Sequence, residues 1–108
     1  MVLTRDFKET VAERIRRDPR FARTLLDEAA TLFLNGEPHT ARLILRDLVN
    51  ATIGFEALAG ETAKPAKSLH RMLSRNGNPT MDNLAIILSV ISRRLGVEIQ
   101  TRIVKAAR

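Results

Sequence analysis

Apolar residues recur at helical spacing along most of the chain. Phe7, Val11 and Ile15 lie four residues apart, and comparable stripes follow them. This spacing puts apolar side chains on one face of an α-helix, so the pattern predicts a series of amphipathic helices. The predicted helices cover about residues 4–17, 19–34, 38–51, 55–60, 65–74 and 81–95. In the second of them, the residues expected to face the core are Phe21, Leu25, Ala29 and Leu32.

Residues that start and stop helices stand at the ends of these stripes. Asp18 followed by Pro19 is typical of an N-cap and a first helical position. Thr4 and Thr80 offer side-chain oxygens as N-caps of the first and last predicted helices. Gly96 is suited to end the last helix, because glycine adopts the left-handed conformation common at helix C-termini.

Residues 97–108 have a different pattern. Val97, Ile99 and Ile103 alternate with polar residues, which is the period of a β-strand. A single strand would leave its backbone unpaired. Two interpretations remain open: the segment pairs with a second copy of the chain in a dimer, or it is a frayed tail.

Composition indicates one small intracellular domain. The 108 residues divide into an N-terminal helical extension (1–36), a helical core (37–96) and the strand-like tail (97–108). The chain has no cysteine, which excludes disulfides, thiolate metal sites and thiol nucleophiles. No apolar run approaches the roughly 20 residues of a membrane span, and the N-terminus lacks the apolar segment of a signal peptide. We therefore expect a cytoplasmic protein without a membrane partner.

Positive charge is concentrated in the second half of the chain. The formal net charge is +6, of which residues 1–54 contribute only +1. Residues 62–80 contain four basic side chains and no acidic one. A block of one sign favours a surface that binds an anionic partner, and solubility alone is the alternative. The basic side chains of the block are Lys64, Lys67, Arg71 and Arg75.

The two short helices around this block have the lengths and spacing of a helix-turn-helix. The apolar face of the second would pack on the core. Lys67 and Arg71 lie one turn apart on another face, from which long basic side chains reach bases or phosphates. The alternative is an ordinary basic helix on a helical bundle.

Enzymatic and metal chemistry find little support. His39 and His70 are too few for a zinc site in a chain without cysteine. Ser68 and Ser74 have no evident base with an orienting partner, and no glycine-rich phosphate loop is present. We expect neither an enzyme nor a bound cofactor.

Several short motifs resemble a known family. Leu-Ala at 58–59, Ser-Leu-His-Arg at 68–71, Leu-Ser at 73–74 and Gly-Asn-Pro at 77–79 resemble the Xre/Cro-type helix-turn-helix regulators. More narrowly, they resemble the HigA-like antitoxins of the addiction module antidote group. The resemblance covers about residues 40–100, and Gly-Asn-Pro is its most specific element. The chain departs from the family at Ala63 in place of a turn glycine, at Lys64-Pro65 in place of a polar cap, and at His70 in place of an aromatic residue.

This resemblance implies a lambda-repressor-like helix-turn-helix bundle. It implies a homodimeric repressor that binds double-stranded operator DNA and neutralises a RelE-like toxin encoded beside it. A prophage-type regulator without a toxin is the alternative, and an RNA-binding or structural adaptor is a more distant one. The residues expected to contact or border DNA are Lys64, Pro65, Ala66, Lys67, Ser68, His70, Arg71, Arg75, Asn76 and Asn78.

Overall fold

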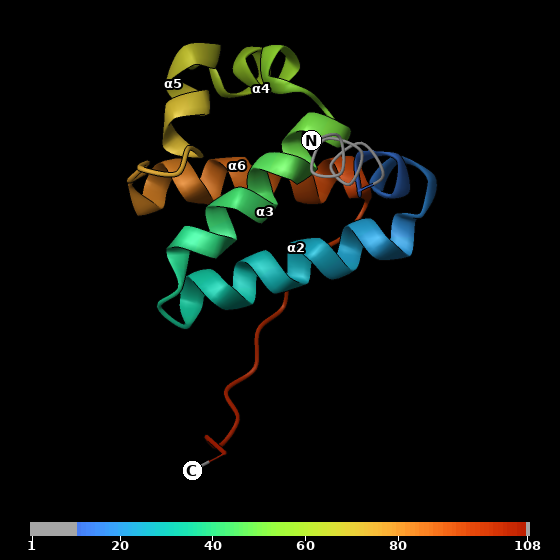
Figure 1. Cartoon of the computed structure of the whole chain (residues 1–108), viewed down its shortest axis with the longest axis vertical. Helices are drawn as coiled ribbons and strands as arrows, with labels where there is room; N and C mark the ends of the chain where they lie inside the picture. Colours follow the sequence, from blue (N-terminus) through green and yellow to red (C-terminus); the bar gives the residue numbers. More distant parts are fainter. Residues whose placement is uncertain (1–10, 108) are drawn as a thin grey trace, which may run out of the picture.

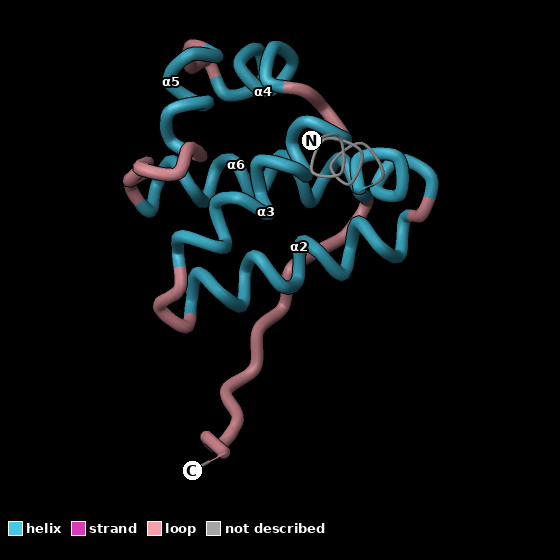
Figure 2. The backbone as a smooth tube through the Cα atoms, in the orientation of Figure 1, coloured by secondary structure: helices cyan, strands magenta, loops and turns pink. Residues whose placement is uncertain are grey.

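The computed structural model describes residues 11–107, and its regular structure is helical throughout (Figure 1). No strand occurs among these residues (Figure 2). The all-α prediction is therefore confirmed, while the predicted N-cap Thr4 lies outside the described residues. After a helical stretch at 11–17, the helices are α2 (Pro19–Leu34), α3 (Pro38–Ala51), α4 (Phe55–Thr62), α5 (Ala66–Met72) and α6 (Met81–Leu95).

The helices form two groups. Helices α2 and α3 run in opposite directions side by side, and α6 crosses behind α3 (Figure 1). The two short helices α4 and α5 sit together at the side of the molecule away from α2. The chain then leaves α6, passes α2 and extends away from the helices. This arrangement places α4 on α3 and α6, on the side away from α2.

Local capping fixes three helix ends as the sequence predicts. The carboxylate of Asp18 accepts hydrogen bonds from the amides of Arg20 (3.0 Å) and Phe21 (3.4 Å) at the start of α2. The hydroxyl of Thr80 accepts from the amide of Asn83 (3.1 Å) at the start of α6. Gly96 ends α6 with φ 68°. These caps satisfy amides and carbonyls that a helix leaves unpaired at its ends.

The buried face of α2 differs from the predicted one. Of the four residues predicted to face the core, only Ala29 is buried, while Phe21, Leu25 and Leu32 are half-buried. Ala29 and Ala41 are both fully buried in the neighbouring helices α2 and α3, and their small side chains allow the two backbones to approach closely. The prediction included Ala29 but selected Phe21 over its neighbour Ala22, because a pattern based on hydrophobicity ranks phenylalanine above alanine. The buried residues of α2 are Ala22, Leu26, Ala29 and Ala30.

The possible C-terminal strand is absent from the described tail. Val97 and Ile99 are half-buried and pack against the core, but residues 100–107 are all exposed. A strand requires a neighbouring extended backbone, and the described part of the chain provides none. The alternating pattern therefore produces an extended tail rather than a sheet within one copy.

Candidate nucleic-acid interface

A left-handed residue makes the connection between α4 and α5. Ala63 has φ 56° and ψ 36°, and it is the non-glycine residue with positive φ in the described chain. The amides of Ala63 and Lys64 both donate to the carbonyl oxygen of Ala59, which closes the end of α4. Pro65 is extended (φ −62°, ψ 139°), and α5 begins at the next residue. Two helices are thus joined within residues 63–65, and α4 runs two residues further than predicted.

The inner side of α5 is fixed against the rest of the molecule. Leu69 and Leu73 are fully buried, and Met72 is half-buried against the same core. The ring of His70 stacks on the ring of Phe55 from α4, with centroids 3.8 Å apart and an interplanar angle of 20°. These contacts hold α5 in one orientation on α4.

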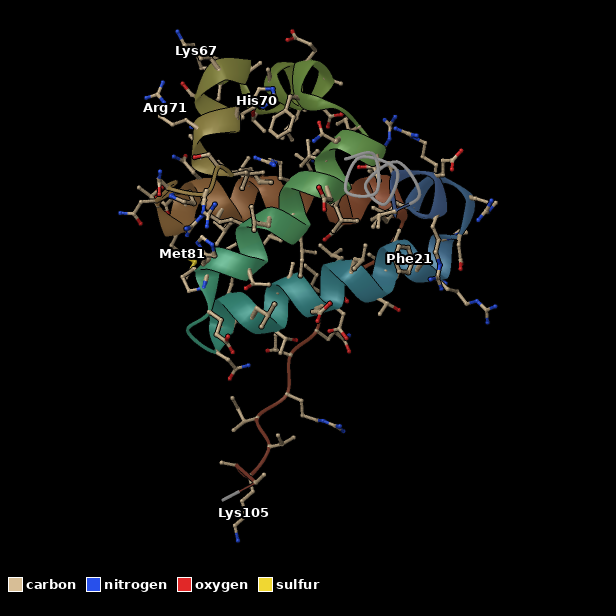
Figure 3. The ribbon with its side chains drawn as sticks, in the orientation of Figure 1. Phe21, Lys67, His70, Arg71, Met81 and Lys105 are labelled. Atoms are coloured by element: carbon tan, nitrogen blue, oxygen red, sulfur yellow. The ribbon has the colours of Figure 1, made fainter. Side chains whose placement is uncertain are left out.

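The outer side of α5 carries cations. Lys67 and Arg71 are exposed and point away from α4 (Figure 3). Next to Arg71 is a surface groove that is lined by Ser68, Arg71, Met72, Asn76, Gly77 and Asn78. Arg75 is exposed in the turn between α5 and this asparagine pair. We call the following set the basic face: Lys67, Ser68, Arg71, Arg75, Asn76 and Asn78.

A close backbone contact shapes the turn after α5. A Cβ atom placed on Gly77 would overlap the carbonyl oxygens of Arg71 and Met72, so the turn folds directly over the end of the helix. The amide of Gly77 donates to the carbonyl of Ser74 (3.0 Å). This packing places Asn76 and Asn78 beside α5, and only glycine fits the contact without a shift of the backbone.

Arg42 of α3 clamps the same turn. Its Nε donates to the carbonyl oxygen of Ser74 (3.3 Å), and its Nη2 donates to that of Arg75 (3.2 Å). The guanidinium satisfies carbonyls beyond the end of α5 and adds a positive charge beneath Arg75. Helix α5 ends at Met72 instead of Ser74, and the residues after it form the turn that Arg42 holds.

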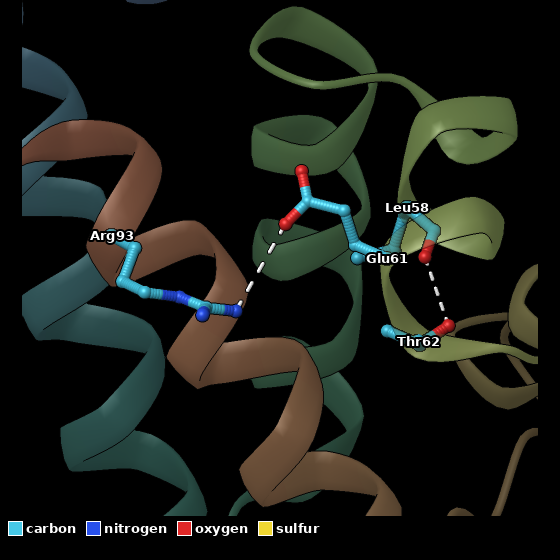
Figure 4. Close-up of polar contacts among 4 residues, drawn as sticks. All are labelled: Leu58, Glu61, Thr62 and Arg93. Atoms are coloured by element: carbon cyan, nitrogen blue, oxygen red, sulfur yellow. Dashed lines mark hydrogen bonds and ion pairs between the residues drawn. The ribbon is translucent and has the colours of Figure 1, made fainter.

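The acidic residue that precedes segment 62–80 approaches an arginine of α6. Glu61, the acidic residue just before the acid-free segment 62–80, approaches Arg93 of α6 with 3.9 Å between Oε1 and Nη2 (Figure 4). The next residue, Thr62, donates its hydroxyl to the carbonyl oxygen of Leu58 (2.8 Å) within α4. The exposed ion pair contributes little to stability, but it directs the carboxylate toward α6.

The structure brings together only part of the predicted site. Ser68, Arg71, Asn76 and Asn78 line one groove, with Lys67 and Arg75 nearby. His70 lies on the α4 side of the helix instead (Figure 3). The remaining predicted residues flank the start of α5: Lys64 and Ala66 are half-buried and Pro65 is exposed.

Sequence reasoning missed Arg42, and it identified Gly77 as a turn residue without its close contact with α5. The Asn-Gly-Asn-Pro cluster indicates a turn, but nothing local shows that the turn packs on the end of α5. In the sequence Arg42 stands between Ala41 and Leu43, and a charged residue between apolar ones is the only local indication of its role. Its partners are more than thirty residues away in sequence.

The described residues were compared with the arrangements that hold a metal ion or cross a membrane. Residues 11–107 contain no group of three or more His, Cys, Asp or Glu side chains arranged to hold a metal ion. Within the same residues, no helix is long and apolar enough to cross a bilayer. Comparison with known proteins gave no match to a family model, a curated protein or a solved structure.

Proposed function

We propose that the protein is a sequence-specific regulator that binds double-stranded DNA by placing α5 in the major groove. Helices α4 and α5 act as the helix-turn-helix unit in this proposal. The observation that carries it is the two-sided nature of α5. Leu69 and Leu73 anchor one side in the core, while Lys67 and Arg71 project from the other. A reading helix needs both a fixed side and an exposed side that bears long polar side chains.

The dimensions of α5 suit this role. Its 7 residues span about 10 Å, and Lys67 and Arg71 are separated by about 6 Å along the helix axis. Base pairs are stacked about 3.4 Å apart, so the two side chains reach the edges of roughly two base pairs. Arginine binds guanine through two parallel hydrogen bonds, and lysine also recognises guanine. Arg75, Asn76 and Asn78 would contact the phosphates beside this site.

Duplex DNA fits the chain better than RNA does. The major groove of A-form RNA is too deep and narrow for side chains to read. Proteins that bind single strands stack bases on aromatic side chains, and this chain has no Trp or Tyr. The acid-free segment 62–80 instead favours an extended polyanion with accessible base edges.

We further propose that the regulator is the antitoxin of a toxin–antitoxin pair and represses its own operon in the cytoplasm. The support is the resemblance of about residues 40–100 to HigA-like antitoxins. In addition, α2 and the helical stretch at 11–17 lie outside the α4–α5 unit, which leaves surface for a protein partner. The alternative remains a prophage-type regulator that has no toxin.

The DNA-binding proposal is tested by selecting bound sequences from a random duplex pool with the purified protein. On the selected site, Lys67→Ala and Arg71→Ala should each weaken binding by about 1–3 kcal/mol, and Arg71→Ala should relax selection at one base pair. Arg20→Ala, an exposed change on α2, is the matched control. Unchanged affinity in a folded Lys67→Ala/Arg71→Ala variant would contradict the assignment.

The antitoxin proposal has a separate test. We expect a neighbouring gene that encodes a small, basic, RelE-like protein. That protein should arrest growth unless this protein is co-expressed. Rescue by the Lys67→Ala/Arg71→Ala variant would show that neutralisation does not depend on DNA binding. A neighbouring region without such a gene would favour the prophage-type alternative.

A further inference from the structure

The tail after α6 is an extended segment whose backbone amides lack hydrogen-bond partners in the described chain from residue 98 onward. Val97 and Ile99 face the core while Glu98 and Gln100 face outward, so the side chains alternate as in a strand. The amides of residues 98–107 make no backbone hydrogen bond in the described chain. After it passes α2, the end of the tail extends away from the helices (Figure 1). An extended backbone in this state is a template for pairing with another strand.

Exposed apolar side chains accompany this free backbone. Ile103 is 96% exposed and Val104 is 68% exposed, and Leu34 at the end of α2 is 63% exposed. A groove between α2 and the tail is lined by all three of these residues. Isolated apolar residues on a surface are ordinary, but here three of them border one groove beside an extended segment without backbone partners.

We propose that two copies of the chain pair through residues 97–103 as antiparallel strands about a two-fold axis that passes Gln100. In this register Val97 lies opposite Ile103 of the second copy, and Ile99 lies opposite Thr101. Glu98 lies opposite Arg102, so opposite charges meet on the outer face of the ribbon. Residues directly opposite one another in an antiparallel pair share a face, so Val97 meets Ile103 on one face and Glu98 meets Arg102 on the other.

Neighbouring registers lose this match. A shift by one position sets Glu98 opposite Ile103 and Ile99 opposite Arg102, which turns charged side chains onto the apolar face. A shift that centres the axis on Thr101 places Glu98 opposite Val104. A shift that centres it on Ile99 places Arg102 opposite Gly96. Of these registers, only the one centred on Gln100 sets Glu98 opposite Arg102.

We choose a second copy of the chain as the partner of the tail because the tail is complementary to itself. A two-fold contact uses the same surface on both partners, so each partner must carry both halves of every pair. Glu98 and Arg102 meet this condition for charge, and Val97 and Ile103 meet it for apolar contact. A strand from a different protein would not require both signs in one short segment.

This inference deepens the proposed function. The dimer itself does not depend on that proposal, but its use does, because the dimer would present two copies of α5 to one operator. Dimerisation is measured without DNA. A failure of pairing therefore appears in the oligomeric state, whereas a failure of the proposed function appears in affinity for DNA.

Sedimentation equilibrium tests the charged pair in the full chain. Glu98→Arg and Arg102→Glu each place like charges opposite one another at two symmetric positions, so each should raise the dimer dissociation constant by about tenfold. An equal mixture of the two variants should recover dimers, because each symmetric pair then joins an arginine of one variant to a glutamate of the other. Lys105→Glu, which lies outside the paired segment, is the matched control. A monomeric wild-type chain at micromolar concentration, or two variants with wild-type constants, would overturn the proposal.

Cross-linking tests the register independently. Gln100→Cys introduces a thiol at the two-fold axis of a chain without cysteine. Opposed Cα atoms in an antiparallel pair are about 4.5–5.5 Å apart, within the range that a disulfide spans. Oxidised glutathione should convert this variant to a covalent dimer and leave Lys105→Cys largely monomeric. Equal cross-linking of both variants would reject the register.

Discussion

Ala63 shows how a single residue carries a backbone strain in the α4–α5 connection. Its left-handed conformation (φ 56°, ψ 36°) costs an alanine about 1–2 kcal/mol, whereas glycine adopts it freely. Glycine also loses about 0.4–1 kcal/mol more backbone entropy on folding. We expect Ala63→Gly to raise the free energy of unfolding by about 0.5–1 kcal/mol, measured by urea denaturation.

A second alanine provides the control for this substitution. Ala85 is exposed in the middle of α6, where Ala→Gly should lower the free energy of unfolding by about 0.5–1 kcal/mol. Opposite signs at the two positions are the expected result. Equal destabilisation would mean that Ala63 does not hold the left-handed conformation in solution.

Substitutions of His70 distinguish a packing role of this residue from a contact with DNA. Its ring stacks on Phe55, and such aromatic pairs contribute about 0.5–1.5 kcal/mol beyond the area that they bury. We expect His70→Ala to lose about this much stability, while His70→Phe keeps the stack and retains operator affinity. Binding assays on the selected DNA and urea denaturation measure the two effects. A large loss of affinity in a stable His70→Phe variant would instead assign the imidazole nitrogens to DNA.

At the scale of elements, the end of α5 depends on the turn that folds over it. A Cβ on Gly77 would overlap backbone carbonyl oxygens that have no room to move. We expect Gly77→Ala to lower the free energy of unfolding by about 1–3 kcal/mol and to displace the asparagines of the basic face. Gly60→Ala is the control, since its Cβ meets nothing within 4 Å and alanine favours the helix. A similar effect of both changes in urea denaturation would argue against the close contact at Gly77.

The sequence predicts an element well where its ends are set by neighbouring residues. Asp18, Thr80 and Gly96 cap their helices through contacts within a few positions, and the structure confirms these helix ends. The ends of α4 and α5 are less well predicted. Ala63 takes a conformation that its side chain disfavours, and Arg42 closes the turn after α5 from another helix. The contact of Arg42 joins residues that are distant in sequence, and it therefore leaves no local pattern.

The same distinction applies to the candidate site. Helical spacing predicts that Leu69 is buried and that Lys67 and Arg71 lie on an exposed face, and the structure confirms both. It does not predict the partner of His70, because the Phe55 ring comes from α4. The groove beside Arg71 also depends on Gly77, whose close approach to α5 is a tertiary contact.

At the scale of the whole molecule, charge sets the expected response to salt. The net charge of +6 is concentrated in the half that contains α5 and the tail, so DNA binding should release counterions and weaken as salt rises. Arg75 lies beyond α5, where a phosphate contact is expected. Arg75→Ala should reduce the slope of log affinity against log salt by about 1 and leave sequence preference unchanged. A slope equal to that of the wild type would exclude a phosphate contact by Arg75.

Selective binding also requires more contact than one copy of α5 provides. A single DNA-binding module buries roughly 600–1,000 Å², and two modules on half-sites about 34–36 Å apart double the contact. If the tails join the two copies, Ile103→Ser should weaken binding to DNA with two half-sites and leave binding to an isolated half-site unchanged. The folded monomer should keep its stability, because Ile103 is exposed within one copy. Titrations of both DNAs measure the difference. Equal loss on both would mean that the tail itself contacts DNA, and no loss on either would place the dimer contact elsewhere.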